Sequence, residues 1–329
     1  MSARTLTEER AADLVHDATT APSLHNAQPW RFRCLRNERT FEIRADPGRG
    51  LPHTDPDARG LHIGCGAAVL NLRVAAAHAG WRPKTRLLPD PRDPALLATV
   101  HLAEPDGGGG DLAALYPAVR RRHTSRRPYA GTRIPEDVRS ALSRAARREG
   151  ALLDFPGPRH LRWVLELTGE ADARNRTDPG RREDLERWTR TGPGAAGPAG
   201  DGVPAPAFGP RGHDGAPVRD FAGTRRMPDR ESADFERAPQ LALLSTLRDR
   251  PEDWLRAGQA MERVLLAATS EGLAGAPATQ ALEWPDLRWP LRDPVSGKGL
   301  VQMVLRLGYG PPGPQTPRRA LSEVLDIAP

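Results

Sequence analysis

Two segments far apart in this chain align on each other without a gap, and this repeat constrains the fold more than any other feature. Residues 66–81, GAAVLNLRVAAAHAGW, match residues 258–273, GQAMERVLLAATSEGL, at both glycines and at three alanines. Small residues at helical spacing let two helices approach closely, so the repeat predicts a central helix pair related by a pseudo-twofold axis. Chance similarity between two alanine-rich helices is the alternative.

Similar elements surround both copies. Periodicity predicts helices over 7–20 and 61–79, with strands at RFRCL, TFEIRAD, TRLL and ATVHL, in the first half of the chain. After a predicted linker, EPDGGGGDL, the second half gives helices in IPEDVRSALSRAARREG, LRWVLELTGEADARNR and 253–271, with strands ALLDF, LALLST and VQMVLRLGY. Residues 177–239 have no counterpart in the repeat and are rich in proline and glycine, which predicts either disorder or a lid. Trp188, Phe208 and Phe221 favour the lid.

Composition narrows the classes of function. No apolar run approaches the roughly 20 residues of a membrane-spanning helix, and the first residues lack a signal-peptide stretch, so we expect a soluble, cytoplasmic protein with no membrane partner. The net charge is +6, but the basic residues are almost all arginines spread along the chain without a recognition motif. We therefore expect no nucleic-acid partner. Cys34 and Cys65 match no metal spacing and are expected to be reduced and structural.

Two basic segments could carry chemistry. YPAVRRRHTSRRPY, Tyr116 to Tyr129, gathers five arginines, a histidine, a threonine and a serine just before a helix. Arginine offers forked donors to phosphate oxygens and hydroxyl groups complete the shell, so the segment suits a phosphate monoester. A solvated basic surface or an RNA contact is the alternative. A second cluster, QTPRRAL with Arg318 and Arg319, could converge with the first on one anion.

Motifs for other chemistries are absent from the sequence. The histidines form no HExxH or other metal spacing, and no GxSxG nucleophile elbow occurs. GLHIGCGAAVL has Gly64 and Gly66 in GxG spacing but lacks the third glycine and the acidic residue of a dinucleotide site, so we predict a helix start packed on its partner. No catalytic side chain and no metal ligand is therefore assigned. The chemistry is expected from an organic cofactor, and a phosphate-bearing one would explain the arginines.

Four segments resemble the FMN-dependent nitroreductase superfamily. APSLHNAQPWRF is similar to its PSxxNxQPW segment, and RHTSR, 122–126, resembles the RHS-type motif that holds the flavin phosphate and ribityl chain. GLAGAPATQ resembles the loop beside flavin N5, and GYGPPGPQTPRRALSEVL resembles the C-terminal strand and phosphate-binding segment. The fused layout, with GLAGAPATQAL and LRLGYG, is most similar to the Acg-type branch.

The resemblance implies an α+β fold of α-β-α layers with mainly antiparallel sheets, in which two fused repeats form a pseudo-twofold dimer. The halves would be residues 1–108 and 109–329, the second with an insertion or lid at about 177–239. PSLHNAQPW occurs only in the first half, and RHTSR and GLAGAPATQ only in the second. We therefore expect one complete site and one FMN per chain, and a monomer or weak homodimer of the fused chain.

The same resemblance implies which residues bind FMN. Arg122, Thr124, Arg126 and Arg318 would hold phosphate and ribityl, with Arg126 near N1 and O2. Residues of the PSLHNAQPW loop would meet the ring from the opposite half, while Gln28 and Trp30 would keep that loop in shape, and the backbone at 279–280 would face N5. The full predicted set is Pro22, Ser23, Asn26, Arg122, His123, Thr124, Ser125, Arg126, Ala278, Thr279, Gln280, Arg318 and Arg319.

The chain also departs from the family's pattern. Many members have an acidic residue where this chain has Thr279 and a lysine near the position of Thr316, and both are missing here. The family's flavin-contacting asparagine and lysine on the next helix have only Arg174 and Asn175 as candidates. These departures put turnover in doubt more than flavin binding.

Two functions are consistent with these features. The first is an oxidoreductase in which NAD(P)H reduces FMN, and a small electron-poor acceptor such as a nitroaromatic compound or a quinone is then reduced. The second is a protein that stores or sequesters FMN, because a lid over residues 177–239 would exclude the nicotinamide. Failure of NADPH and NADH to bleach the bound flavin would remove the first.

Overall fold

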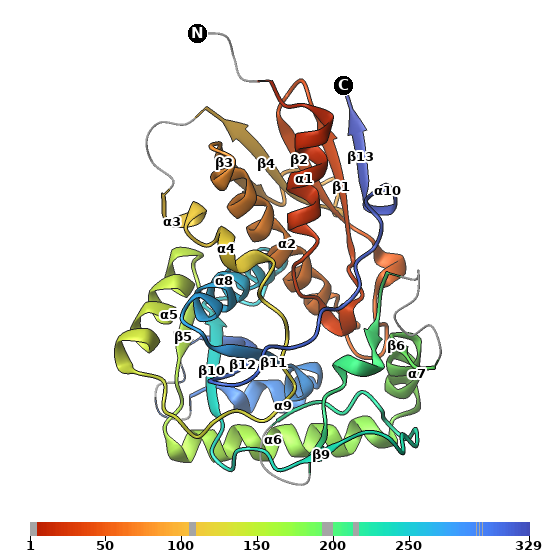
Figure 1. Cartoon of the computed structure of the whole chain (residues 1–329), viewed down its shortest axis with the longest axis vertical. Helices are drawn as coiled ribbons and strands as arrows, with labels where there is room; N and C mark the ends of the chain where they lie inside the picture. Colours follow the sequence, from red (N-terminus) through yellow and green to blue (C-terminus); the bar gives the residue numbers. More distant parts are fainter. Residues whose placement is uncertain are drawn as a thin grey trace.

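The computed structural model describes residues 5–104, 110–192, 200–212, 217–293, 295, 297 and 299–329 (Figure 1). Most of the linker predicted at EPDGGGGDL lies outside these residues. The described chain forms two main sheets with a pair of long helices between them (Figure 1).

The first sheet has five strands in the order β13-β1-β2-β4-β3. Its strands are β1 (Trp30–Leu35), β2 (Thr40–Ala45), β3 (Arg82–Leu87), β4 (Leu96–Ala103) and β13 (Leu325–Ala328). Side chains alternate between buried and exposed along β1, as expected for a strand with one face on the core. The pairs β1–β2, β2–β4 and β3–β4 are antiparallel, whereas β13 returns from the far end of the chain to pair in parallel with β1.

The second sheet has four antiparallel strands in the order β11-β12-β10-β5. These are β5 (Leu152–Asp154), β10 (Gln240–Thr246), β11 (Ala274–Ala278) and β12 (Leu300–Gly308). Strands β10 and β12 are buried along almost their whole length, because helices cover them. The other described strands form two short parallel ladders. One pairs β6 (Thr189–Arg190) with β7 (Val203–Pro204), and the other pairs β8 (Arg211–Gly212) with β9 (Ser232–Ala233). Helices and mainly antiparallel sheets make this an α+β fold, as predicted.

Helices α2 (Arg59–His78) and α8 (Pro251–Ser270) pack against each other at the centre of the molecule. A Cβ on Gly66 would overlap the carbonyl oxygen of Leu255, and a Cβ on Gly258 would overlap that of Ile63. Each glycine also lies against the Cα of the other. The matched glycines of the repeat therefore meet at the crossing point and let the two backbones touch.

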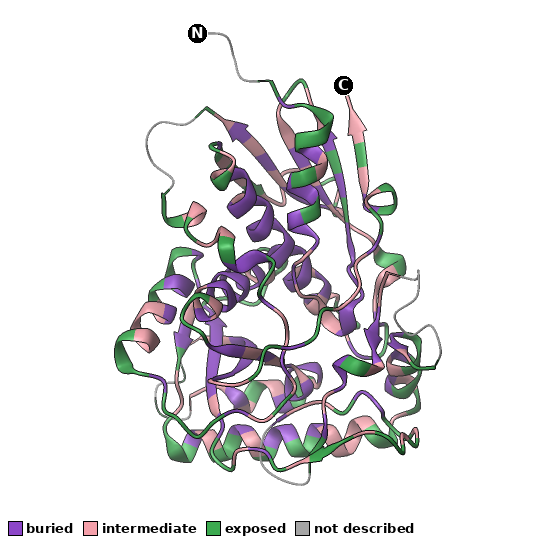
Figure 2. Cartoon of the chain, viewed as in Figure 1, coloured by how far each residue is buried: buried purple, intermediate pink, exposed green. Residues whose placement is uncertain are grey.

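Helix α2 is long and apolar enough to cross a membrane by length and composition, contrary to the expectation that no segment approaches such a span. In the fold 78% of its apolar window is buried inside the protein. Figure 2 shows the same burial for both central helices. The apolar character of α2 is explained by its contacts with α8 and the first sheet.

The remaining helices surround this centre. They are α1 (Glu8–Ala18), α3 (Gly110–Ala113), α4 (Tyr116–Val119), α5 (Glu136–Arg148), α6 (Pro158–Thr177), α7 (Pro179–Arg187), α9 (Pro285–Arg288) and α10 (Leu321–Val324). The predicted helix 61–79 begins two residues earlier, because the Asp55 carboxylate accepts hydrogen bonds from the N–H groups of Gly60 at 2.8 Å and Leu61 at 2.9 Å. This side chain caps α2 from outside the helix, so periodicity did not locate the helix start.

Within 177–239, the described residues carry α7 and the two short ladders. The aromatic side chains of Trp188, Phe208 and Phe221 are all buried. Phe208 and Phe221 belong to a small apolar cluster of their own, and Trp188 packs with Ala27 and Leu51 of the first half. The described part of this segment therefore rests on the loop that follows α1.

Candidate functional site

The PSLHNAQPW loop connects α1 to β1 and has an unusual backbone. His25, Asn26 and Gln28 have φ values of 49°, 55° and 53°, in the left-handed region that non-glycine residues seldom occupy. The Ser23 hydroxyl accepts a hydrogen bond from the Gln28 N–H at 2.9 Å and closes the turn. Such strained backbone persists only where surrounding contacts hold it, and it clusters at functional sites.

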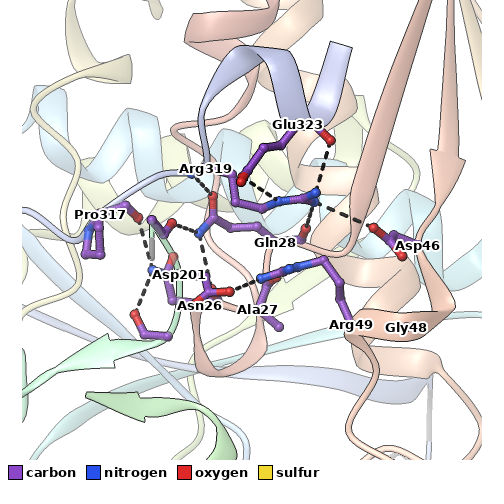
Figure 3. Close-up of polar contacts among 12 residues, drawn as sticks. Asn26, Ala27, Gln28, Asp46, Gly48, Arg49, Asp201, Pro317, Arg319 and Glu323 are labelled. Atoms are coloured by element: carbon purple, nitrogen blue, oxygen red, sulfur yellow. Dashed lines mark hydrogen bonds and ion pairs between the residues drawn. The ribbon is translucent and has the colours of Figure 1, made fainter. Parts of the chain in front are cut away.

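Two amide side chains of this loop connect three distant parts of the chain (Figure 3). Asn26 Nδ2 donates to the carbonyl oxygens of Gly202, at 2.8 Å, and Pro317, at 3.1 Å. Gln28 Nε2 donates to the Gly200 carbonyl at 2.7 Å, and Gln28 Oε1 accepts from the Arg319 N–H at 3.0 Å. The loop, the segment that includes residues 200–202 and the C-terminal basic segment are therefore fastened together here.

The two basic clusters converge on the carbonyl oxygens that end α1. Arg122 donates to the Thr20 carbonyl at 2.9 Å, and Arg318 donates to the same oxygen at 2.8 Å and to the Thr19 carbonyl at 2.6 Å. Arg122 Nε also lies 3.1 Å from Glu262 Oε1 on α8. Burial together with Arg122 lowers the pKa of Arg318 to about 9. Two guanidinium groups thus meet beside a single carboxylate, which leaves the cluster with an excess positive charge.

Glu262 gives this cluster a pH dependence that can be measured. Burial raises the pKa of its carboxyl from 4.5 to about 7, although Arg122 opposes the shift. The folded state therefore binds this proton more tightly than the unfolded state, so the group stabilises the fold below about pH 4.5 and that stability is lost as the pH rises through 7. The wild type should therefore lose about 3 kcal/mol in the free energy of unfolding over this pH range. Glu262→Gln, which lacks the titrating carboxyl, should not show this loss.

Urea unfolding of the wild type and Glu262→Gln at several pH values between about 4.5 and 7.5 measures this difference. Glu166→Gln, an exposed glutamate on α6, controls for the loss of one carboxyl group. If the free energies of unfolding of the wild type and Glu262→Gln differ by the same amount at every pH, the burial of this carboxyl is contradicted.

RHTSR runs along the free edge of the second sheet. Thr124 forms a parallel bridge with Gly275 of β11, and the Ser125 N–H donates to the Gly275 carbonyl at 3.1 Å. The Ser125 hydroxyl donates to the Pro311 carbonyl at 2.7 Å. Ser125 is thereby fixed between β11 and the C-terminal segment, and Arg126 follows it toward a cavity.

A cavity of about 480 Å³ lies where these segments meet. Its walls include residues of the PSLHNAQPW loop, residues 54–57, the start of α2, RHTSR, residues 217–221, α8, the β11–η4 turn (η4, Gln280–Glu283), residues 285–292 and β12. Much of the lining is apolar, including Leu24, Ile63, Met261, Leu282, Val301 and Met303. This volume and an apolar lining with a few polar groups are typical of a site for a small organic molecule.

One part of the cavity wall is positively charged. Arg126 Nη1 donates to the Ala207 carbonyl at 2.8 Å, and its guanidinium lies 4.5 Å from the centre of the Phe221 ring. Among the described residues no carboxylate pairs with Arg126. Burial and the nearby Arg219 lower its pKa to about 10, so it remains charged at neutral pH. Arg219 itself pairs with Glu283, which also accepts the Thr279 hydroxyl at 2.7 Å. The wall therefore offers an uncompensated guanidinium to an anionic or oxygen-rich ligand.

The predicted residues divide into two groups. Those that line the cavity are Pro22, Ser23, Thr124, Arg126 and Thr279. Asn26, Arg122, Ser125, Arg318 and Arg319 bind other parts of the protein, as described above, and His123 lies near Arg122 and Arg318, which with burial lower its pKa. Ala278 ends β11, and Gln280 begins η4 with its side chain 3.5 Å from Asp172. Their roles toward a cofactor stay predictions.

Arg174 and Asn175, the candidates on α6 for the family's flavin-contacting asparagine and lysine, face elsewhere. Arg174 pairs with Glu170 and Asp286, and Asn175 accepts a hydrogen bond from the Trp284 indole at 3.0 Å. Neither residue lines the cavity.

Several cavity residues were not predicted from the sequence. They are His25, Arg59, Arg219, Phe221 and Glu283. His25 lies inside the PSLHNAQPW loop, at a position that the PSxxNxQPW pattern leaves open, and Arg219 lies in a segment without a repeat counterpart. Only the fold shows that these residues face the same space.

Sequence relatives place the chain in a family. A Mycobacterium tuberculosis H37Rv protein, provisionally named NAD(P)H nitroreductase, is 35% identical over 317 residues, which cover 94% of this chain and 89% of that protein. The chain belongs to the NAD(P)H nitroreductase family. The same organism has a further nitroreductase-family relative, provisionally named NAD(P)H nitroreductase acg, which is 28% identical over 94% of this chain and 93% of its own length. No family model matches the sequence.

Solved structures of nitroreductases were also compared with this nitroreductase-family chain. A nitroreductase with bound FMN from Bacteroides fragilis covers 63% of this chain and 93% of its own, at 16% identity and a TM-score of 0.38. A variant of the FMN and NADPH-dependent nitroreductase NfnB from Sphigopyxis sp. strain HMH covers 64% and 97%, at 17% identity and a TM-score of 0.40. These low scores add nothing to the family assignment, which rests on the sequence relatives.

Proposed function

We propose that this protein binds FMN and acts as an NAD(P)H-dependent oxidoreductase on an electron-poor acceptor such as a nitroaromatic compound or a quinone. The observation that carries the proposal is the cavity, where Arg126 presents a guanidinium that has no carboxylate partner among the described residues, between largely apolar walls. The sequence relatives named as NAD(P)H nitroreductases support the same activity.

The residues present fit a flavin. A cavity of about 480 Å³ lies within the usual range for cofactors and small ligands. Its apolar walls suit a planar ring, and Arg126 suits the oxygen-rich edge of that ring. Arg122 and Arg318, the predicted phosphate ligands, do not line this cavity, and in this structure they donate to the carbonyl oxygens of residues 19–20. Their excess positive charge would favour a phosphate that lies beside them.

When bound, FMN supplies hydride transfer at N5. The protein's own residues would bind and orient the ring and exclude water from it. Arg126 would stabilise negative charge on the ring edge, and its effect is strong because the guanidinium is shielded from solvent. Trp254, Ile63 and Met261 would keep the cavity apolar.

We also propose that the chain is a fused pseudo-dimer with halves at 1–108 and 109–329 and one FMN per chain. The reciprocal packing of Gly66 and Gly258 and the presence of one sheet beside each central helix support the duplication. The cavity draws on the PSLHNAQPW loop from the first half and on RHTSR and β11 from the second. The absorbance spectrum of the purified protein tests the stoichiometry, and its mass in solution tests the expectation of a monomer or weak homodimer.

A storage function is the second candidate, and one ion pair favours it. Residues 217–221 form part of the cavity wall, and Arg219 joins them to Glu283 in η4. Arg181 of α7 approaches the other oxygen of Glu283 at 3.4 Å. This network ties the segment 177–239 to the β11–η4 turn, and a segment held there would restrict access to the cavity.

Anaerobic mixing with NADPH or NADH separates the two functions. An oxidoreductase should lose its flavin absorbance at about 1–1000 s⁻¹, the usual range of enzyme turnover, and recover it when a quinone is added. A protein that binds one equivalent of flavin but is not bleached over many minutes is a storage protein. A protein that binds no flavin would contradict both.

A further inference from the structure

His25 stands out in the cavity wall because its ring has no hydrogen-bond partner within the described ranges of the chain. The residue is 4% exposed, and neither Nδ1 nor Nε2 has a partner among the described residues. Its nearest aromatic neighbour, Phe221, approaches edge-on with 5.2 Å between the ring centres and offers no polar atom. Buried ring nitrogens are nearly always paired, so this imidazole lacks a group that the cavity would normally contain.

The loop holds His25 in place without help from the imidazole. The backbone of His25 and Asn26 is left-handed, and Asn26 and Gln28 fasten it to residues 200–202 and to the C-terminal segment. The side chain is therefore positioned by its neighbours' bonds. A residue held in this way can meet a ligand with little loss of conformational freedom.

The surroundings keep the imidazole neutral. Burial lowers its pKa well below the usual value, and the charges of Arg219 and Arg126 act in the same direction. Glu283, which pairs with Arg219, compensates only one of these two arginines. A neutral imidazole has one N–H donor and one acceptor nitrogen, so it can donate to a ligand oxygen without carrying charge.

We propose that His25 donates a hydrogen bond to an oxygen of the electron acceptor and makes the cavity select nitro or quinone compounds over apolar rings of the same shape. The assignment rests on the proposed oxidoreductase function. The acceptor is favoured over the flavin because the family resemblance assigns Pro22, Ser23 and Asn26 of this loop to the ring. His25 instead packs against Phe221, in a segment that the resemblance does not cover. His25 is thus a ligand-contacting residue that the family motif does not assign.

The test compares two probes of similar shape on the oxidised protein as purified, where no reduction takes place. Nitrobenzene carries acceptor oxygens and chlorobenzene does not, and calorimetric titration gives the affinity of each. In His25→Leu and His25→Asn the preference for nitrobenzene over chlorobenzene should fall about three- to tenfold, the value of one ordinary hydrogen bond. His25→Asn is included because asparagine tolerates left-handed backbone, so it should fold even if the leucine variant does not.

His101→Asn is the matched control, since His101 lies on β4 beside Thr40 and outside the cavity wall. The His101→Asn variant should prefer nitrobenzene over chlorobenzene to the same extent as the wild type. With the reduced protein, the His25 variants should raise the KM for a quinone more than they lower kcat. Ferricyanide accepts electrons without a directed hydrogen bond, so the variants should reduce it at the wild-type rate.

Two results would overturn the inference. If the variants bind nitrobenzene and chlorobenzene more weakly by the same factor, His25 contributes packing contacts and no hydrogen bond. An unchanged probe preference together with an altered flavin spectrum or looser flavin would show that the cofactor is its partner. Failure of the proposed function is recognised separately, because a protein without flavin or without NAD(P)H bleaching still permits the calorimetric comparison.

Discussion

Gly258→Ala should strongly destabilise the fold, although the substitution adds only one methyl group. The new Cβ would overlap the carbonyl oxygen of Ile63 and press on the Cα of Gly66, and both are backbone atoms of α2 that cannot rotate away. Helices α2 and α8 would have to separate along the centre of the molecule, and every contact between them would loosen. We expect a loss of about 3 kcal/mol or more in the free energy of unfolding, measured by urea denaturation and by the melting temperature.

Gly169→Ala is the control for this prediction. Gly169 also lies inside a 20-residue helix, α6, but a Cβ there would meet nothing within 4 Å. Alanine favours helix over glycine, so this variant should be more stable than the wild type by about 0.5–1 kcal/mol. If both variants had the same stability, the close approach of α2 and α8 would be disproved.

Arg126→Ala should weaken FMN retention about 10- to 100-fold. The guanidinium faces the cavity and pairs with no carboxylate in the part of the chain that the structure describes, so a charge-assisted bond to the flavin would be lost, at a cost of about 1.5–3 kcal/mol. The dissociation constant is measured by titrating the flavin-free protein with FMN and following the quenching of flavin fluorescence.

Arg127→Ala provides the comparison for Arg126. Arg127 is the next residue, but it is exposed and pairs with Glu231 at 3.3 Å on the surface. Its removal changes the net charge equally and should leave FMN retention within about twofold, because exposed ion pairs contribute little. Unchanged retention in Arg126→Ala would show that the RHTSR segment had been assigned to the wrong role.

Sequence patterns predicted the elements of this fold well where one face of an element is buried. The matched glycines and alanines of 66–81 and 258–273 predicted the contact between α2 and α8, because only small residues permit it. The start of α2 was less accurate, since its cap is the side chain of Asp55, which precedes the helix and leaves no periodic signal. The apolar length of α2 also shows that composition alone does not distinguish a central helix from a membrane span.

The site was harder to predict because its residues come from segments that only the tertiary fold brings together. The motifs located Ser23, Thr124 and Arg126 on the cavity wall. They could not show that Arg122 faces Glu262, since that contact depends on how RHTSR crosses α8. The cavity role of Arg219 depends on a segment without a repeat counterpart, for which no periodic pattern exists.

The parallel pairing of β13 with β1 has a consequence for how the chain acquires its structure. Phe32 lies beside Leu325, so one edge of the first sheet is completed by residues that a ribosome adds about 300 positions after the strand they join. During synthesis this edge of β1 stays unpaired until β13 has been made. The pairing then closes a very long loop, which is slow compared with local folding. A nascent chain that stalls before residue 325 would expose an unpaired strand, which is the kind of surface that chaperones bind and that promotes aggregation.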